Sequence, residues 1–280
     1  MNRRSFLSLA TVSALASYGL HKYYTTDNID EDISNAAVDS LNENSSLLKV
    51  KKFDSTFSQD VLLEQNRMST LLSLHKKLKY LQSYVGYANF SILGVSDLVR
   101  YSNNSSKIET FTPQELELVD DLFNVNAKEY GFLGERVNYK LNERIERKVL
   151  TKVAATGQYV YKGHSLDTYK RLKDDVGQEL ILTSGVRGIA KQLYLFVNKA
   201  VAVQGNLSRA SRSLAPPGHS YHAIGDFDVG MRGLGELNFT KEFANTTVYE
   251  QIRTIEYINI RYHETNALGV RYEPWHIKVV

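Results

Sequence analysis

Two short polar stretches, far apart in the sequence, constrain the fold of this chain more than any other feature. SYHAIGDFDVG, at residues 220–230, holds one histidine and two aspartates within seven residues. EPWH, at residues 273–276, holds a glutamate three residues before a histidine. A catalytic zinc ion needs three protein ligands, an open position for water, and a nearby carboxylate that takes a proton from that water. A fold that uses both stretches in one such site must bring the end of the chain next to residues 220–230.

The composition narrows the chemistry of such a site. The chain of 280 residues is long enough for one or two domains with a sizeable core. Its net charge is only +3 and its lysines and arginines are spread out, so we expect no nucleic-acid partner. It contains no cysteine, which excludes disulfides, thiolate zinc ligands and a cysteine nucleophile.

The N-terminus carries features of an export signal. Arg3 and Arg4 precede an uncharged, moderately apolar run at residues 5–20, and NRRSFLS resembles the twin-arginine signal of bacteria, although Ser8 stands where a lysine is common. The run is too short and too polar for a comfortable membrane span, so we expect only transient membrane contact through this signal. An ordinary secretory signal and an uncleaved anchor are the alternatives. We expect export, to the bacterial periplasm, with residues 1–20 as the signal.

The rest of the chain divides into three regions by the texture of its sequence. Residues 21–57 are rich in Asn, Asp, Ser and Thr and predict a linker or a loosely ordered arm. Residues 58–155 show helical spacing of apolar side chains and predict a mainly helical N-terminal region. Residues 156–280 predict an α+β domain, in which a small antiparallel sheet with flanking helices carries the zinc site.

Local patterns predict the individual elements. Thr112, Pro113 and Glu115 form a capping box with proline in the first turn, which is typical of a helix start. Turn residues at 184–188 separate a short apolar strand from a helix. We expect helices at 59–85, 113–130, 135–155, 165–176, 189–203 and 247–258, and strands at 179–183, 227–230, 269–272 and 275–279.

Each polar fragment is a weak signal by itself. A lone histidine is more often a core or surface residue than a ligand, and Glu-x-x-His occurs by chance in many proteins. Here, however, His222 is followed by Asp226 and Asp228, and His276 closes a Glu-x-x-His near the C-terminus. Together with Arg187, which follows a predicted strand and turn, the set is hard to attribute to chance.

SGVRG, SYHAIGDFDVG and EPWH together resemble the signature of the bacterial zinc D-alanyl-D-alanine carboxypeptidases, a family that includes vancomycin-resistance carboxypeptidases. The resemblance covers residues 156–280. It implies a Zn²⁺ cofactor with His222 and His276 as metal ligands. It also implies Glu273 as the general base that activates the zinc-bound water.

The same resemblance implies a substrate contact and leaves one ligand open. Arg187 and Ser220 would hold the terminal carboxylate of the substrate. The family usually places its aspartate ligand seven residues after the histidine, but that position is Val229 here, so the segment is one residue short. Asp228 aligns best with the family's Asp-Val-Gly ending and is preferred to Asp226. If neither reached the metal, the chain would be a non-catalytic relative.

The resemblance and the predicted export together imply a zinc metallopeptidase that removes the C-terminal D-Ala of peptidoglycan stem peptides. A bidentate contact from Arg187 would select a free C-terminal carboxylate and therefore favours a carboxypeptidase. Two alternatives remain open. The first is an endopeptidase of the same group that cuts peptidoglycan cross-links, and the second is a non-catalytic cell-wall binding module.

Overall fold

The computed structural model describes residues 46–280, all of which belong to one compact unit. The predicted export signal at residues 1–20 and most of the predicted arm at 21–57 lie outside the described residues. Among helices of the described part, none combines the length and the apolar character needed to cross a membrane.

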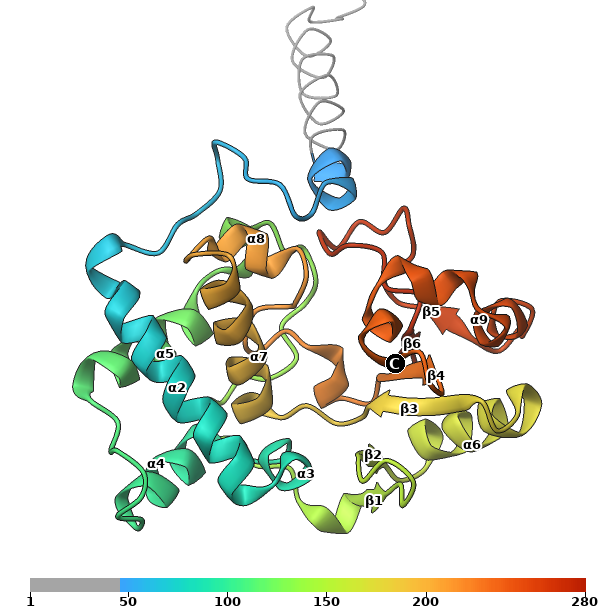
Figure 1. Cartoon of the computed structure of the whole chain (residues 1–280), viewed down its shortest axis with the longest axis horizontal. Helices are drawn as coiled ribbons and strands as arrows, with labels where there is room; N and C mark the ends of the chain where they lie inside the picture. The colour runs from blue at the N-terminus through green and yellow to red at the C-terminus, as the bar shows by residue number, and fades with distance from the viewer. Residues whose placement is uncertain (1–45) are drawn as a thin grey trace, which may run out of the picture. The chain divides into compact units, whose positions relative to one another are not determined.

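A small antiparallel sheet forms the centre of the C-terminal part (Figure 1). The side-chain alternation of a strand is clearest in β4 (Phe227–Met231), where Phe227 and Val229 are fully buried in the core and Asp228 lies between them. All neighbours in the sheet are antiparallel, and the strand order is β3 (Leu180–Ser184), β4 (Phe227–Met231), β6 (His276–Lys278) and β5 (Asn259–Ile260).

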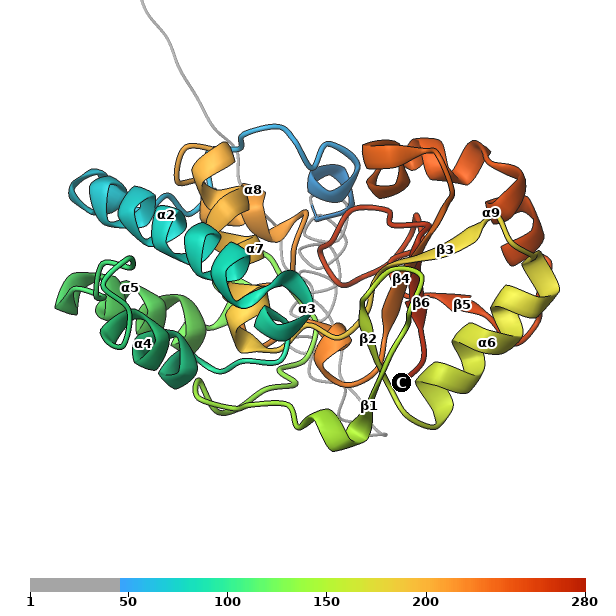
Figure 2. The ribbon, with the colours of Figure 1, turned by 60° about the horizontal axis from the view of Figure 1, so that its bottom comes forward.

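Helices α6 (His164–Val176) and α9 (Thr247–Ile252) pack with the core face of this sheet (Figure 2). Tyr169 and Leu172 of α6 share one apolar cluster with Phe227 of β4. Burial of such side chains is worth about 1.5–3 kcal/mol each, which fixes which face of the sheet is turned away from solvent. The other face is left for polar side chains.

A second apolar core lies between helices. The α2 helix (Met68–Val85) buries Leu71, Leu74, Leu78 and Leu81 completely, at the three- and four-residue steps seen in the sequence. This face packs on α7 (Ile189–Ala202), which follows β3 directly in the chain. The same cluster also takes in α4 (Val95–Asn103), α5 (Pro113–Asn124) and α8 (Leu207–Ser211).

The α-helix predicted at 59–85 begins later, at Met68, after a 3₁₀ turn at Gln65–Arg67, because the backbone at 61–63 is bonded elsewhere. The backbone N–H of Leu63 donates to the carbonyl oxygen of Gly205 at 2.8 Å, and that of Leu207 donates to the carbonyl oxygen of Val61 at 2.9 Å. These backbone groups are therefore not available for helical hydrogen bonds.

The helix predicted at 135–155 is wrong. The apolar side chains at four-residue spacing belong instead to an irregular segment that bonds to the chain around α3 (Tyr87–Phe90) and α4. The backbone N–H of Ile145 donates to the carbonyl oxygen of Ile92, and the backbone N–H of Val95 donates to the carbonyl oxygen of Leu141. The segment ends in β1 (Leu150–Lys152), which pairs with β2 (Tyr159–Tyr161) in a hairpin that the sequence analysis missed.

The other predicted elements are confirmed with shifted ends, except for the strand predicted at 269–272. The capping box of α5 is formed in both directions between Thr112 and Glu115, but the α-helix stops at Asn124 and a short 3₁₀ turn follows. The α9 helix stops at Ile252, well before residue 258. No strand forms at 269–272 in the described chain. The predicted fold class, a small antiparallel sheet with flanking helices, is confirmed.

Candidate metal centre

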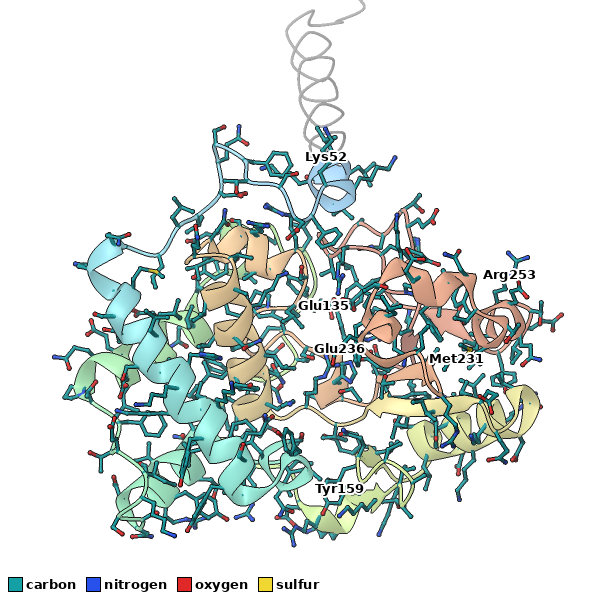
Figure 3. All side chains as sticks on the ribbon, in the orientation of Figure 1. Lys52, Glu135, Tyr159, Met231, Glu236 and Arg253 are labelled. Carbon is teal, nitrogen blue, oxygen red and sulfur yellow. The ribbon has the colours of Figure 1, made fainter. Side chains whose placement is uncertain are left out.

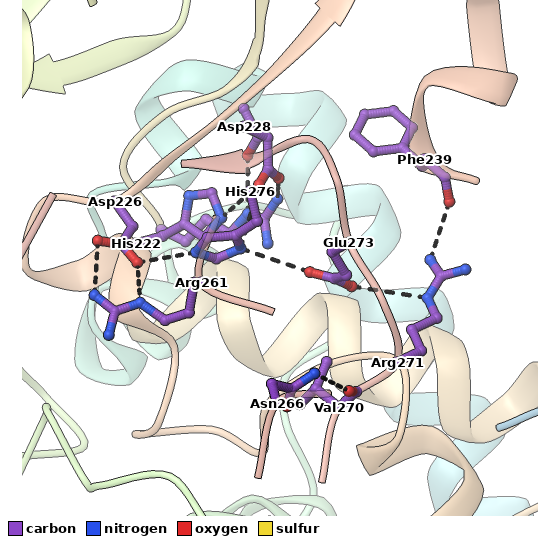
Figure 4. A network of polar contacts seen from close by, with 12 residues as sticks. His222, Asp226, Asp228, Phe239, Arg261, Asn266, Val270, Arg271, Glu273 and His276 are labelled. Atoms are coloured by element: carbon purple, nitrogen blue, oxygen red, sulfur yellow. Dashed lines mark hydrogen bonds and ion pairs between the residues drawn. The ribbon is translucent and has the colours of Figure 1, made fainter. Parts of the chain in front are cut away.

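The register of the sheet assembles the polar centre. Asp228 of β4 lies directly opposite His276 of β6 and is paired on its other side with Ser184 at the end of β3. Because side chains alternate along a strand, Asp228 points away from the core that Phe227 occupies. Figure 4 shows the resulting network, in which side chains from both polar stretches face one another.

His222 reaches the centre from the 3₁₀ turn Tyr221–Ala223, just before β4. Its Nδ1 donates to the carbonyl oxygen of Gly185 over 2.7 Å, and its Nε2 lies 3.1 Å from Oδ1 of Asp228. Burial, together with the positive charge of Arg187, lowers the pKa of His222 to about 4. The ring is therefore neutral at pH 7, which is the form that binds metals.

His276 is held from the opposite side by Asp226. The Nε2 of His276 lies 3.0 Å from Oδ2 of Asp226, and Arg261 donates two hydrogen bonds to that carboxylate, at 2.5 and 3.0 Å. The Nδ1 of His276 faces Asp228 Oδ1 at 3.4 Å. Although burial alone would lower it, the hydrogen bonds to Asp226 and Glu273 raise the pKa of His276 to about 9, so a metal ion has to displace a proton from this ring.

The two histidines and Asp228 fit a metal ion. Their ligand atoms all lie within 4.8 Å of one another, and all three residues are buried. Each ring has one nitrogen bonded to the protein and turns the other toward Asp228, which is the arrangement of metal-binding histidines with a fixed tautomer. Two imidazoles and one carboxylate leave a fourth position open, as in catalytic zinc sites.

The geometry separates the two aspartates that the sequence left open. Both oxygens of Asp226 accept hydrogen bonds, from Arg261, His276 and the backbone of Val279. Asp228 lies between the two rings instead. The shortened spacing after His222 therefore still brings an aspartate to both histidines.

Glu273 stands at the side of this cluster. Its Oε2 lies 3.5 Å from Nδ1 of His276, and its Oε1 lies 3.7 Å from Nε of Arg271. The backbone N–H of Glu273 donates to the carbonyl oxygen of Tyr262, which fixes where the side chain begins. The carboxylate borders an open cleft and does not bridge the two histidines, which suits a proton acceptor better than a ligand.

Arg187 and Ser220 lie differently from each other. Arg187 pairs through Nη2 with Asp228, donates through Nε to Ser184 Oγ at 2.8 Å, and lines the cleft. Ser220 is buried at the start of the 3₁₀ turn that carries His222, and it is not among the residues that line this cleft. The structure thus brings Arg187, but not Ser220, to the cleft wall.

The cleft has a volume of about 500 Å³ and is lined by residues of the N-terminal helices and of the C-terminal part that contains the sheet. Glu236, which is labelled in Figure 3, is one of the lining residues. The α3 helix and its following turn contribute Tyr87 and Ser91, and Trp275 closes the wall near β6. The polar and charged residues of the lining, besides those already named, are Gln158, Thr183, Lys191, Asn198, Lys199 and Ser213.

Three residues of this region were missed in the sequence. Arg261, which fixes Asp226, lies in a stretch without any motif, and only the fold shows its role. Arg271 borders Glu273 and stacks between the rings of Phe53 and Trp275. Lys191 carries the one available signal: it lies in the first turn of the predicted helix that follows SGVRG, four residues after Arg187.

Residues 164–280 match the model of the VanY family, which is described as D-alanyl-D-alanine carboxypeptidase. The match includes all of the residues that form the centre described above. In the comparison with curated proteins, nothing matches.

Several solved structures are similar over part of the chain. One is the LdcB LD-carboxypeptidase, described in connection with peptidoglycan recognition, with 25% identity, 55% of this chain and 78% of that chain covered, and a TM-score of 0.43. Another is a variant of the vancomycin-resistance D,D-pentapeptidase VanY in complex with Zn(II), with 23% identity, 47% and 78% covered, and a TM-score of 0.35. A third is VanYB in complex with D-alanine-D-alanine, with 21% identity, 52% and 81% covered, and a TM-score of 0.37.

Proposed function

We propose that this protein is a zinc-dependent D-alanyl-D-alanine carboxypeptidase that acts on peptidoglycan stem peptides, since residues 164–280 match the model of the VanY family. One observation supports the proposal more than any other. His222, Asp228 and His276 turn their free ligand atoms toward one point, and Glu273 stands beside them at a cleft. A binding module would not need a carboxylate at this place.

The residues of the centre have distinct roles in this mechanism. When bound by His222, Asp228 and His276, a zinc ion supplies a water of lowered pKa and polarises the scissile carbonyl. Glu273 accepts the proton of the attacking water and returns it to the departing amine. Asp226 holds Nε2 of His276 and so keeps the opposite nitrogen turned toward the centre.

Arg187 is proposed to select the end of the peptide. Its guanidinium lies at the cleft wall next to Asp228, so a terminal carboxylate bound there lies close to the reacting bond. A free C-terminus is then favoured, because a peptide that ends in an amide offers the guanidinium no carboxylate for a charge-assisted, bidentate contact. Ser220 is proposed to act with Arg187 on the same family resemblance, although it lies off the cleft lining.

The proposed site of action is outside the cytoplasm, in the bacterial periplasm, where peptidoglycan stem peptides are found. This part of the proposal rests on the twin-arginine-like sequence at residues 1–20. It is tested by fractionating cells that express the protein and its variant with Arg3 and Arg4 both replaced by lysine. We expect the variant to remain in the cytoplasm.

The activity is tested on the purified mature protein with a synthetic stem pentapeptide that ends in D-Ala-D-Ala. We expect one zinc per chain and release of the terminal D-Ala. Glu273→Gln should keep the zinc and lose at least about 100-fold in kcat, because general base catalysis contributes about 10²–10⁴-fold.

Each other outcome points to a different function. Zinc without D-Ala release, combined with cleavage of a cross-linked peptide, would replace the carboxypeptidase by an endopeptidase. A protein that binds cell-wall peptides but retains no zinc would be a binding module. Arg187→Ala separates the first two, since only cleavage at a free carboxylate should depend on it.

A further inference from the structure

One face of α7 forms a wall of the cleft. Lys191, Leu195, Asn198 and Lys199 all line it, at the spacing of side chains that share one side of a helix. The helix begins two residues after Arg187, and Lys191, the first side chain of this row, lines the same cleft as the arginine. Two cations, Arg187 and Lys191, therefore line the substrate cleft near the start of α7.

Lys191 has no acidic partner in the part of the chain that the structure describes. Its Nζ donates to Oε1 of Gln82 at 2.5 Å and lies 5.4 Å from the ring centre of Tyr194. Gln82 is itself buried, so it holds the ammonium in place from α2. Burial and the charge of Arg187 lower the pKa of Lys191 to about 8. A charged ammonium beside a second cation therefore lowers the stability of the folded protein.

Part of the Arg187 guanidinium is already bound within the protein. Its Nε is used by Ser184 and its Nη2 by Asp228. An ammonium has three N–H groups, and only one of those of Lys191 is used by Gln82. Lys191 thus has spare donors at the position where a bound carboxylate would need them.

We propose that Lys191 binds the terminal carboxylate of the substrate together with Arg187, as the second cation of the carboxylate site. The inference rests on the proposed function. It extends the carboxylate site to a residue of α7 that lies outside the SGVRG, SYHAIGDFDVG and EPWH motifs. It also gives the N-terminal helices a function, because Gln82 of α2 fixes the position of Lys191.

The experiment measures binding of two ligands that differ only at the carboxylate. The ligands are a stem pentapeptide that ends in D-Ala-D-Ala and the same peptide with a C-terminal amide. Both are titrated into the zinc-loaded Glu273→Gln protein, which binds without turnover. Lys191→Met, Lys191→Arg and Lys170→Met are added in that background. Lys170 is an exposed lysine of α6 outside the cleft lining and controls for loss of one positive charge.

We expect Lys191→Met to weaken binding of the acid by about tenfold or more and to leave binding of the amide within about twofold, because a charge-assisted contact is lost only with the acid. Lys191→Arg should retain most of the preference for the acid, and Lys170→Met should retain all of it. In the active protein, Lys191→Met should raise KM for the acid by a similar factor and change kcat much less.

A purely structural role would give a different result. Lys191→Met would then weaken binding of both ligands equally and lower the Tm, whereas we expect the Tm to rise because a half-buried charge is removed. An unchanged preference for the acid in Lys191→Met overturns the proposal while D-Ala release by the wild type still supports the carboxypeptidase. If neither peptide binds and no D-Ala is released, the proposed function fails and this inference fails with it.

Discussion

At the scale of single residues, Asp226 and Asp228 show how position decides chemistry. Both are buried carboxylates of the same short stretch. Asp226 accepts two hydrogen bonds from Arg261 and one from His276, so neither of its oxygens is free to bind a metal ion. Asp228 lies between the two histidine rings. The first aspartate orients His276, and the second is placed to bind a metal ion together with both histidines.

Replacement of each aspartate by asparagine should therefore have unequal effects on metal affinity. Asp228→Asn removes the charge of the proposed carboxylate ligand, and we expect no stoichiometric zinc after dialysis. Asp226→Asn keeps all three ligands but weakens the hold on His276, and we expect zinc affinity to fall by about 10–100-fold. Competition with a chromogenic chelator measures both. Equal losses in the two variants would contradict the assignment.

Lys191 gives a prediction about stability and pH. Burial and Arg187 lower its pKa from 10.5 to about 8 in the folded protein. Below pH 8 the lysine is charged in both states, so the full cost to folding is present. Between pH 8 and 10.5 the folded protein has lost the proton that the unfolded chain keeps, so this cost disappears as the pH rises.

We therefore expect Lys191→Met to have a larger free energy of unfolding than the wild type at pH 7, by at most about 3 kcal/mol. The difference should shrink between pH 8 and 10.5. Urea denaturation of both proteins across this range measures it. The groups around the ammonium are Arg187, Tyr194 of α7 and Gln82 of α2. A variant that is less stable at pH 7 would contradict the assigned cost.

At the scale of elements, the segment at 53–63 is fastened by one buried ion pair. Arg212, just after α8, donates to both oxygens of Asp60 at 2.7 and 3.0 Å and to the carbonyl oxygens of Phe53 and Ser55. The ring of Phe53 in turn lies against Arg271, which borders Glu273 in the cleft. The segment before α2 is thereby tied to a wall of the cleft.

Asp60→Asn should lower the free energy of unfolding by about 3–5 kcal/mol, because it leaves the buried charge of Arg212 unpaired. Asp54→Asn is the matched control: Asp54 pairs with Arg209 at an exposed position, and we expect a change below about 1 kcal/mol. Chemical denaturation of the two variants makes the comparison. Similar small losses in both would show that the Arg212 pair does not fasten the segment.

The ion pair between Arg212 and Asp60 should also affect the pH dependence of stability in acid. Burial alone would raise the pKa of Asp60, but hydrogen bonds from Arg212, Phe57 and Asn206 lower it from 3.8 to about 2. Its contribution to stability is present above pH 3.8 and is lost as the pH falls toward 2. The free energy of unfolding of Asp60→Asn should therefore depend less on pH in that range than that of the wild type.

At the scale of the whole molecule, the helical core crosses the predicted boundary between residues 155 and 156. Leu193, Phe196 and Val197 of α7 are buried in the same cluster as Leu74 and Leu78 of α2. The cleft is lined from both sides of that boundary, and the family match begins only at residue 164. Residues 58–155 therefore supply part of the core and part of the cleft wall.

We expect the fragment 156–280 to lose cooperative unfolding, because α7 would expose an apolar face that α2 covers in the whole chain. The fragment 46–280 should unfold in one transition. Thermal unfolding followed by near-ultraviolet circular dichroism compares the two. A cooperative transition of the short fragment at the Tm of the long one would support the boundary at 155/156 as a true domain boundary.

Several elements could be predicted from the sequence because their causes are local. The α5 capping box needs only Thr112 and Glu115, and the apolar steps of α2 follow from helix geometry. The helix predicted at 135–155 failed because apolar spacing does not reveal that Ile145 bonds to Ile92, far away in the chain. For the same reason β5, which completes the sheet edge beside β6, had no usable signal.

The sequence by itself determined the kinds of atom available for a metal centre, because the chain has no thiol and its two polar stretches hold the histidines and carboxylates. Only the tertiary structure decided how these atoms are used. Antiparallel pairing places Asp228 opposite His276, while Arg261 occupies Asp226. Such choices depend on strand register and on contacts between distant segments, and physical distance between those segments is not encoded in any local pattern.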